Sequence, residues 1–305
     1  MMNLPFEKIE SLLPLFLIFG VLVLMLALLQ RKLGEIRVGF SDERPHACFL
    51  RSPGESILAR IDRATGELVA FGVAVAVVPL VLILTYLVYV LFTRNREGWM
   101  DIAYLVCLST GFLLYGGNKL RRLSAKKRRL RKVYAGLQAV ALEINRLMLS
   151  GHHVYHDFPS GGFYIDHIIV GPTGVFTVQS RIPSQFESAN GSQDKTVSVD
   201  GNELIFRKTT DTRAIQTTAF RASWLASWVL TATGEALRVH PLLTLPGWTV
   251  DIIDEQDVIT VDSAKIGDVI RTTRVNPLST NAIHRLCTEI ENKYRCELSR
   301  KRKLK

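Results

Sequence analysis

The first 118 residues carry three long apolar stretches, and the rest of the chain carries none of that length. Charged residues are absent from 11–30, 68–93 and 102–118, and Met100 extends the third stretch at its start. About 20 helical residues span the hydrocarbon core of a bilayer, because a helix rises about 1.5 Å per residue. We therefore expect transmembrane helices at about 11–30, 68–93 and 100–118.

Two of these stretches have an alternative interpretation. The first resembles a signal peptide in length, but it lacks a basic segment before it and a small-residue cleavage site after it. The third is short enough to be a buried helix of a soluble domain. Its closeness to the second stretch favours a membrane hairpin instead.

Beyond residue 133 the pattern becomes that of a globular α/β domain. Apolar residues recur with the helical period over 134–149 and again over 215–230, and the last helix is expected near 281–300. Short apolar runs bounded by turn residues predict strands between these helices. The runs lie at 152–158, 165–181, 196–206 and 240–254, with a polar loop at 183–195. Helices that alternate with strands are typical of an α/β fold.

These patterns divide the chain into four parts. Residues 1–118 form a membrane region with a loop at 31–67 between the first two spans. Residues 119–133 form a basic helix next to the membrane, and 134–275 form the α/β domain. Residues 276–305 form a C-terminal helix and a basic tail. We expect the tail to be solvated and without regular structure.

Lysine and arginine are distributed unevenly around the apolar stretches. The 31–67 loop and the 119–132 run are rich in basic residues, whereas the 94–101 loop contains only two. Because cytoplasmic loops collect Lys and Arg, we expect the 31–67 loop and everything after 118 to be cytoplasmic and the N-terminus to be outside. The net charge of +10 favours anionic partners, either lipid headgroups or nucleic acid.

Metal-binding side chains give a weaker signal. The four cysteines contain no C-x-x-C pair, which argues against a zinc site or a disulfide framework. Four histidines and one acid gather around the first strands, at His152, His153, His156, Asp157 and His167. They suggest either a transition-metal site or hydrogen bonds that orient strand ends. Neighbours on a strand point to opposite faces, which favours the hydrogen-bonding interpretation.

One stretch stands out for its chemistry. Ile165 to Arg181, IDHIIVGPTGVFTVQSR, predicts two strands joined by a tight turn, with Asp166 on the first strand and Gln179 and Arg181 closing the second. Around it lie a helix with Gly136, Val140 and Glu143-Ile144-Asn145, then VYHDF, DGNELIF, IQTTAFRASWLASWV and LPGWTV. In this order and spacing, from about 134 to 261, the motifs resemble the NERD, or nuclease-related, domain.

The resemblance implies a restriction-endonuclease-like fold of the PD-(D/E)xK superfamily, with a mixed sheet flanked by helices and preceded here by three transmembrane helices. In that superfamily an acid on one strand and a Glu-x-Lys on the next hold Mg²⁺ at one edge of the sheet. Residues two apart on a strand share a face, which brings these groups together. The metal activates water against a phosphodiester.

Carried over position by position, the motif is incomplete in this chain. Asp166 matches the strand acid and is the one firm metal ligand, Gln179 stands in place of the Glu, and Arg181 stands in place of the Lys. The Gly-Glu pair of the first helix is Gly136-Leu137 here. Gln216 matches a glutamine at the start of the later helix, and Glu143 is the candidate for a compensating acid.

These replacements change what the site can do. Gln179 removes a negative charge from a site that must hold a divalent cation, and Arg181 is too basic to accept a proton. One carboxylate beside a permanent cation favours direct pairing between Asp166 and Arg181, or the binding of an anion.

Three functional hypotheses follow. The first is a catalytically degenerate nuclease fold, without cofactor, that binds nucleic acid or a protein at the membrane. The second is an active Mg²⁺-dependent nuclease that uses Asp166, Gln179 and Glu143. The third is a docking subunit of a membrane assembly, whose affinity for nucleic acid would be nonspecific and salt-sensitive.

Overall fold

The computed structural model of this chain describes residues 50–93, 99–183, 195–207, 209–254, 257–273 and 277–303. The chain divides into two compact units, one of residues 1–44 and 60–128 and the other of residues 45–59 and 129–305. The boundaries fall within two long helices, α2 (Glu55–Thr93) and α3 (Trp99–Asn145). The predicted span at 11–30 and residues 184–194 of the polar loop predicted at 183–195 lie outside the described residues.

In the first unit α2 and α3 pack against each other as an antiparallel pair. The ammonium group of Lys119 lies 4.3 Å from the centroid of the Phe71 ring. One turn further along, Gly116 lies against Val75, where a Cβ would come within 2.5 Å of a Val75 methyl carbon. The contacts advance along α2 as they retreat along α3, so the two helices form a hairpin.

Among the described residues, one helix, Glu55–Val88, is long and apolar enough to cross a membrane. It contains most of the span predicted at 68–93, but α2 begins at Glu55, so residues 55–67 are helical and not part of a loop. The span predicted at 100–118 forms the first part of α3 and is not a second candidate in the described region. Among the described residues, one such helix is therefore found, and not three.

The second unit is built around a five-stranded mixed sheet. Its strand order is β1-β2-β3-β7-β9, with β1 (His153–Pro159), β2 (Tyr164–Gly171), β3 (Gly174–Ser180), β7 (Val239–Thr244) and β9 (Ile259–Val261). The first three strands are antiparallel, whereas β7 is parallel to β3 and β9 is parallel to β7. The predicted hairpin is confirmed as β2 and β3, which meet at the pair Gly171 and Gly174.

A four-stranded sheet with the order β6-β5-β4-β8 lies in the same unit. Its strands are β4 (Thr196–Asp200), β5 (Glu203–Ile205), β6 (Thr210–Asp211) and β8 (Thr249–Ile252). We expected one strand in 240–254, but this segment contributes β7 to the first sheet and β8 to the second. The break lies at Pro246-Gly247, where Gly247 has a φ of 75°, a value that favours glycine.

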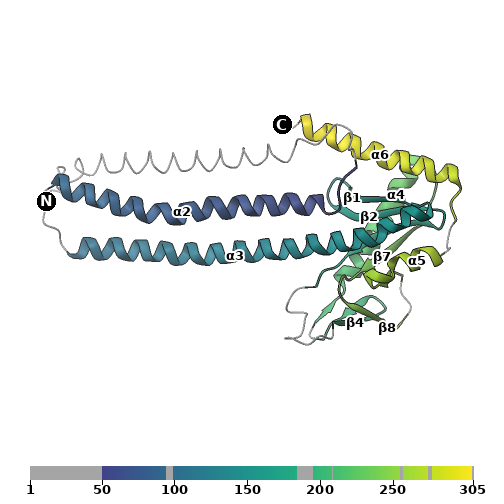
Figure 1. Cartoon of the computed structure of the whole chain (residues 1–305), viewed down its shortest axis with the longest axis horizontal. Coiled ribbons are helices and arrows are strands. Elements are labelled where there is room, and N and C mark those ends of the chain that lie inside the picture. The colour runs from purple at the N-terminus through teal and green to yellow at the C-terminus, as the bar shows by residue number, and fades with distance from the viewer. Residues whose placement is uncertain are drawn as a thin grey trace, which may run out of the picture. The chain divides into compact units, whose positions relative to one another are not determined.

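Helices cover both faces of the five-stranded sheet (Figure 1). On one face α4 (Arg213–Thr233) and α6 (Thr280–Lys303) pack around Phe158, Leu225 and Ile290. On the other face the end of α3 and α5 (Ile266–Thr272) pack around Ile144 and Phe176. Two short 3₁₀ helices complete the unit, η1 (Arg146–Ser150) and η2 (Ser263–Lys265). The domain is therefore an α/β fold with mixed sheets flanked by helices, as predicted.

The C-terminal segment differs from its prediction. We expected the basic tail after residue 298 to lack regular structure, but α6 remains helical to Lys303. Lysine and arginine are good helix formers, and basic residues near the C-terminus of a helix interact favourably with its dipole.

Candidate functional site

Two acids lie opposite each other where the ladder between β1 and β2 is interrupted. The register pairs His156 with His167 and Phe158 with Ile165, and it omits the two acids between them, Asp157 and Asp166. Asp157 has a φ of 52°, in the left-handed region that side chains other than glycine rarely adopt. At this interruption the two neighbouring carboxylates face different surroundings.

The carboxylate of Asp157 caps the first turn of α2. Its Oδ2 accepts a hydrogen bond of 3.0 Å from the backbone N–H of Ser56, and its Oδ1 accepts one from the Ser56 hydroxyl. Arg51 Nη1 lies 3.0 Å from the same Oδ2, and the side chains of Arg51 and Asp157 are 8% and 4% exposed. Burial raises the pKa of Asp157 in spite of these partners. Asp157 thus has a structural role.

The carboxylate of Asp166 has fewer partners. Its Oδ2 accepts a hydrogen bond of 2.9 Å from the backbone N–H of Ser180 on β3. Its Oδ1 lies 3.9 Å from Nη1 of Arg221, which comes from α4. Burial raises the pKa of Asp166 to about 6, although Ser180 and Arg221 act in the opposite direction. This acid therefore titrates close to neutral pH.

Gln179 and Arg221 are joined directly. Arg221 Nη1 donates a hydrogen bond to Oε1 of Gln179, and the same nitrogen faces Asp166. Gln179 is only 4% exposed, and its Nε2 has no hydrogen-bond partner among the described residues. One guanidinium thus lies between the amide oxygen on β3 and the carboxylate on β2.

Arg181 has a different partner from the one expected. Its Nε donates to Oδ2 of Asp211 at 2.7 Å, and its Nη1 donates to the carbonyl oxygen of Ile182 at 3.0 Å. Of the two expected outcomes, pairing with Asp166 or binding of an anion, the first is not found, since Arg181 pairs with Asp211 instead. Oδ1 of Asp211 also accepts from the backbone N–H groups of Arg213 and Ala214, which caps the start of α4.

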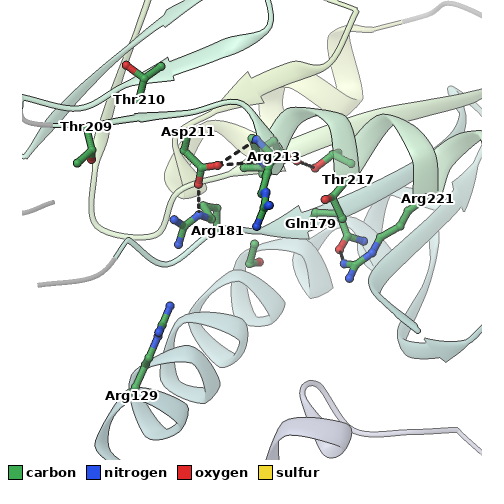
Figure 2. A pocket seen from close by; sticks show the side chains of 13 residues that line it. Arg129, Gln179, Arg181, Thr209, Thr210, Asp211, Arg213, Thr217 and Arg221 are labelled. Atoms are coloured by element: carbon green, nitrogen blue, oxygen red, sulfur yellow. Dashed lines mark hydrogen bonds and ion pairs between the residues drawn. The ribbon is translucent and has the colours of Figure 1, made fainter. Parts of the chain in front are cut away.

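Gln179, Arg181, Asp211 and Arg221 line a pocket of about 550 Å³, and Asp166 lies beside Arg221, outside the residues that line it. Figure 2 shows Arg129 extending from α3 on the side of the pocket opposite to Asp211 and Arg213. Most residues that line the pocket carry a positive charge or a hydroxyl group. They are Arg129, Gln179, Ser180, Arg181, Thr209, Thr210, Asp211, Arg213, Ala214, Thr217, Thr218, Arg221 and Leu243. Four arginines face one acid, and that acid already binds Arg181. The pocket is therefore electropositive.

Residues 132–246 match the family model of the NERD, or nuclease-related, domain. The match covers Asp166, Gln179, Arg181 and Arg221, and it confirms the resemblance stated from the sequence. No curated protein and no solved structure matches the chain.

Three predicted positions of the NERD motif lie elsewhere. Gln216 is exposed on α4 and does not line the pocket. Glu143 forms a 3.0 Å ion pair with Arg146, one turn along the same segment, and the charges that shift the pKa of Asp166 come from Arg221 and Asp157. Leu137 is 4% exposed and belongs to the buried core. The structure brings Asp166 and Gln179 together, and neither Glu143 nor Gln216 joins them.

Two of the histidines near the first strands, His156 and His167, form a buried hydrogen-bonded pair. The Nδ1 atoms of His156 and His167 lie 2.8 Å apart, so one donates to the other, and His156 Nε2 binds Oδ1 of Asn145 at 3.1 Å. Burial lowers the pKa of His156 to about 4 and that of His167 well below its usual value. Among the described residues no group of three His, Cys, Asp or Glu side chains is placed to hold a metal.

Two residues that shape the pocket, Arg221 and Asp211, were not predicted from the sequence. Arg221 reaches Gln179 across 42 positions in the sequence, and Asp211 reaches Arg181 across 30. Gln216 and Arg221 lie on the same predicted helix. Their spacing alone did not indicate which of the two side chains faces the sheet. The buried face of α4 contains Ile215, Thr218, Ala222 and Leu225, and this pattern leaves Gln216 outside it.

Proposed function

We propose that the NERD domain of this chain binds nucleic acid through its arginine pocket without cutting it. The observation that carries the proposal is the position of Arg221, whose guanidinium lies between Gln179 and Asp166. In the nucleases that this motif resembles, acids at those two positions hold Mg²⁺ between them. Here a side chain with a permanent positive charge lies in that place.

The residues of the site do not fit a magnesium ion. Mg²⁺ requires oxygen ligands in near-octahedral geometry, and Asp166 is the one carboxylate that pairs with Arg221 among the described residues. The amide oxygen of Gln179 already accepts from Arg221, and its other polar atom is a donor. A divalent cation beside Arg221 would also be repelled by the guanidinium. The site is therefore poorly suited to metal-dependent hydrolysis.

The same features suit a phosphate group. Guanidinium groups bind phosphate oxygens through paired, charge-assisted hydrogen bonds. Among the described residues, the side chains of Arg129 and Arg213 have no acidic partner, and both line the pocket. The orphan Nε2 of Gln179 adds a buried donor at the pocket wall. These groups can neutralise a phosphodiester without a metal ion.

We also infer that the chain is anchored in a membrane with the NERD domain in the cytoplasm and the N-terminus outside. The helix at Glu55–Val88 can cross a bilayer by length and composition. Residues 45–59 and 129–305 form one unit, so both segments lie on the same side of the membrane. If α2 crosses the bilayer, the chain must therefore cross it a second time before residue 129. In this proposal α3, which is antiparallel to α2, makes the second crossing, and the basic 119–132 run supports a cytoplasmic end.

Fluorescence anisotropy with labelled DNA tests the binding proposal. The full-length chain in detergent micelles should bind DNA in the presence of EDTA, and binding should weaken as salt increases. Arg213→Ala should weaken it, whereas Arg285→Ala should not, since Arg285 pairs with Glu235 away from the pocket. Absence of binding, or binding that requires Mg²⁺, would overturn the proposal.

Labelling of a cysteine tests the orientation. Cys296 is exposed on α6, so a full-length chain that retains only this cysteine should react with an impermeant maleimide in inside-out vesicles. The same chain should not react in intact cells. The reverse pattern would contradict the cytoplasmic placement.

A further inference from the structure

An aromatic cluster, formed by Phe163, Phe220 and Trp224, lies beside the arginine pocket. The ring centroid of Phe163 is 5.6 Å from that of Phe220 and 5.4 Å from that of Trp224. Phe163 and Trp224 are half-buried against the core, but Phe220 is 59% exposed. The cluster thus presents an apolar ring to solvent on a rigid base.

Arg221 connects this cluster to the pocket. Its guanidinium carbon lies 5.6 Å from the centroid of the Phe163 ring, and the same side chain lines the pocket and binds Gln179. Thr217, Phe220, Arg221 and Trp224 follow each other at helical spacing on α4, so they share one side of the helix. The cationic pocket and the aromatic cluster are therefore two halves of one continuous surface.

We propose that this surface selects single-stranded nucleic acid, with a phosphate in the arginine pocket and an unpaired base stacked on Phe220. The inference rests on the proposed function and adds the class of nucleic acid to it. Proteins that bind single strands combine a basic groove with aromatic rings on which bases stack. Bases in a duplex are paired and stacked on each other, and they do not offer a free face to Phe220.

The charge of the surface favours this occupant over an apolar one. Three arginines within or beside the pocket, Arg129, Arg213 and Arg221, are placed to meet an anion. An apolar peptide or a lipid chain on Phe220 would leave the guanidinium groups of Arg129 and Arg213 without an anionic partner. A nucleotide supplies an aromatic face and an anionic group on one molecule, which matches both halves.

The test compares three labelled probes on the full-length chain in detergent micelles containing EDTA. They are an oligothymidylate of about 12 nucleotides, which suits one small domain, an abasic strand of the same length, and a blunt-ended duplex. The oligothymidylate should bind about tenfold more tightly than the abasic strand, because only it can stack. Phe220→Ala should remove that difference and leave the other two affinities unchanged.

Two further variants separate stacking from a general loss of structure. Phe220→Trp should retain the preference for oligothymidylate, since indole also stacks. Leu230→Ala removes another exposed apolar side chain of α4, 50% exposed, and should change none of the three affinities.

The outcomes distinguish this inference from the proposed function. If all three probes bind equally and Phe220→Ala changes nothing, the stacking inference is wrong and the phosphate pocket stands. If none of them binds, the proposed function itself fails. If Phe220→Ala instead alters the oligomeric state in size-exclusion chromatography, with equal affinity for every probe, the cluster is a protein interface and the inference is overturned.

Discussion

Asp157 and Asp166 lie on neighbouring strands at the same interruption of the β1–β2 ladder, and they differ in the donors around them. Asp157 accepts hydrogen bonds from the backbone and side chain of Ser56 and forms a close ion pair with Arg51. Asp166 accepts one backbone hydrogen bond and lies 3.9 Å from Arg221. Burial raises the pKa of both carboxyls.

The two acids differ in where their partners lie along the chain, and this difference indicates which acid stabilises the fold and which lies beside the pocket. The partners of Asp157 come from residues 51–56, before the matched NERD region, and they fasten the start of α2 to β1. The partners of Asp166 are Ser180 on β3 and Arg221 on α4, which lie inside the matched region and line the arginine pocket. Asp157 therefore supports the fold, and in our proposal Asp166 adjusts the charge of the pocket.

Removing the carboxylate of Asp157 should have the largest effect. Asp157→Ala should lower the free energy of unfolding by about 3–5 kcal/mol, because Arg51 would remain buried with only Glu55 as a neighbouring acid. Denaturant unfolding of the full-length chain in detergent, followed by tryptophan fluorescence, measures this loss. Asp166→Ala is the matched control and should cost much less. Equal losses would remove the distinction between the two acids.

Loss of one pocket arginine should have the next largest effect, on binding and not on stability. Arg129→Ala and Arg213→Ala should each weaken DNA binding by roughly tenfold and reduce the slope of log affinity against log salt by about 1. Anisotropy titrations at several salt concentrations provide both values. An unchanged slope in both variants would show that these arginines do not contact phosphate.

The pH dependence of binding tests the role of Asp166. As the pH falls through about 6, Asp166 takes up a proton, and the loss of its negative charge should raise DNA affinity roughly threefold. His156, with a pKa of about 4, and His167 remain neutral in this range. Asp166→Asn should bind DNA at every pH with the affinity that the wild-type chain reaches only at low pH. If the affinity of this variant still changed with pH as in the wild type, a group other than Asp166 would cause the pH dependence.

Stability should respond to the same titration with a defined sign. The folded-state pKa of Asp166 is raised above its ordinary value of 3.8, so the folded state holds this proton more strongly than the unfolded state. Its contribution to stability is therefore present below about pH 4 and is lost as the pH rises through about 6. Asp166→Asn should remove that part of the pH dependence of unfolding.

The smallest effect is expected at Gln216. Although it matches a glutamine of the family motif, it is exposed and outside the pocket, so Gln216→Ala should change DNA affinity less than twofold. The anisotropy titration used for Arg213→Ala measures the DNA affinity of Gln216→Ala, and the affinity of Gln179→Ala is measured beside it for comparison. A large loss at Gln216 would place the binding surface elsewhere on α4.

The local pattern of residues predicted most elements of the domain, because hydrophobic period and turn residues are local properties. The hairpin of β2 and β3 and the helices α4 and α6 follow from them. The split of 240–254 between two sheets does not, since strand pairing depends on distant partners. The Arg51–Asp157 pair joins residues 106 positions apart, and no sequence spacing predicts such a contact.

The candidate site was predictable in part for the same reason. Asp166, Gln179 and Arg181 were identified because they match positions of the NERD motif on a hairpin, but the motif did not predict that Arg181 binds Asp211. Arg221 was missed because its role depends on how α4 rotates over the sheet. Its proximity to Gln179 converts an incomplete metal site into a cationic one, which the motif alone does not reveal.

A cleavage assay on the full-length chain tests the central claim, that Arg221 lies where a nuclease holds its metal ion. Labelled single-stranded and duplex DNA and RNA would be incubated with the protein and Mg²⁺ or Mn²⁺, with Asp166→Ala as the control. We predict that the nucleic acid binds and stays intact, with or without metal. Metal-dependent cleavage that disappears in Asp166→Ala would contradict the account.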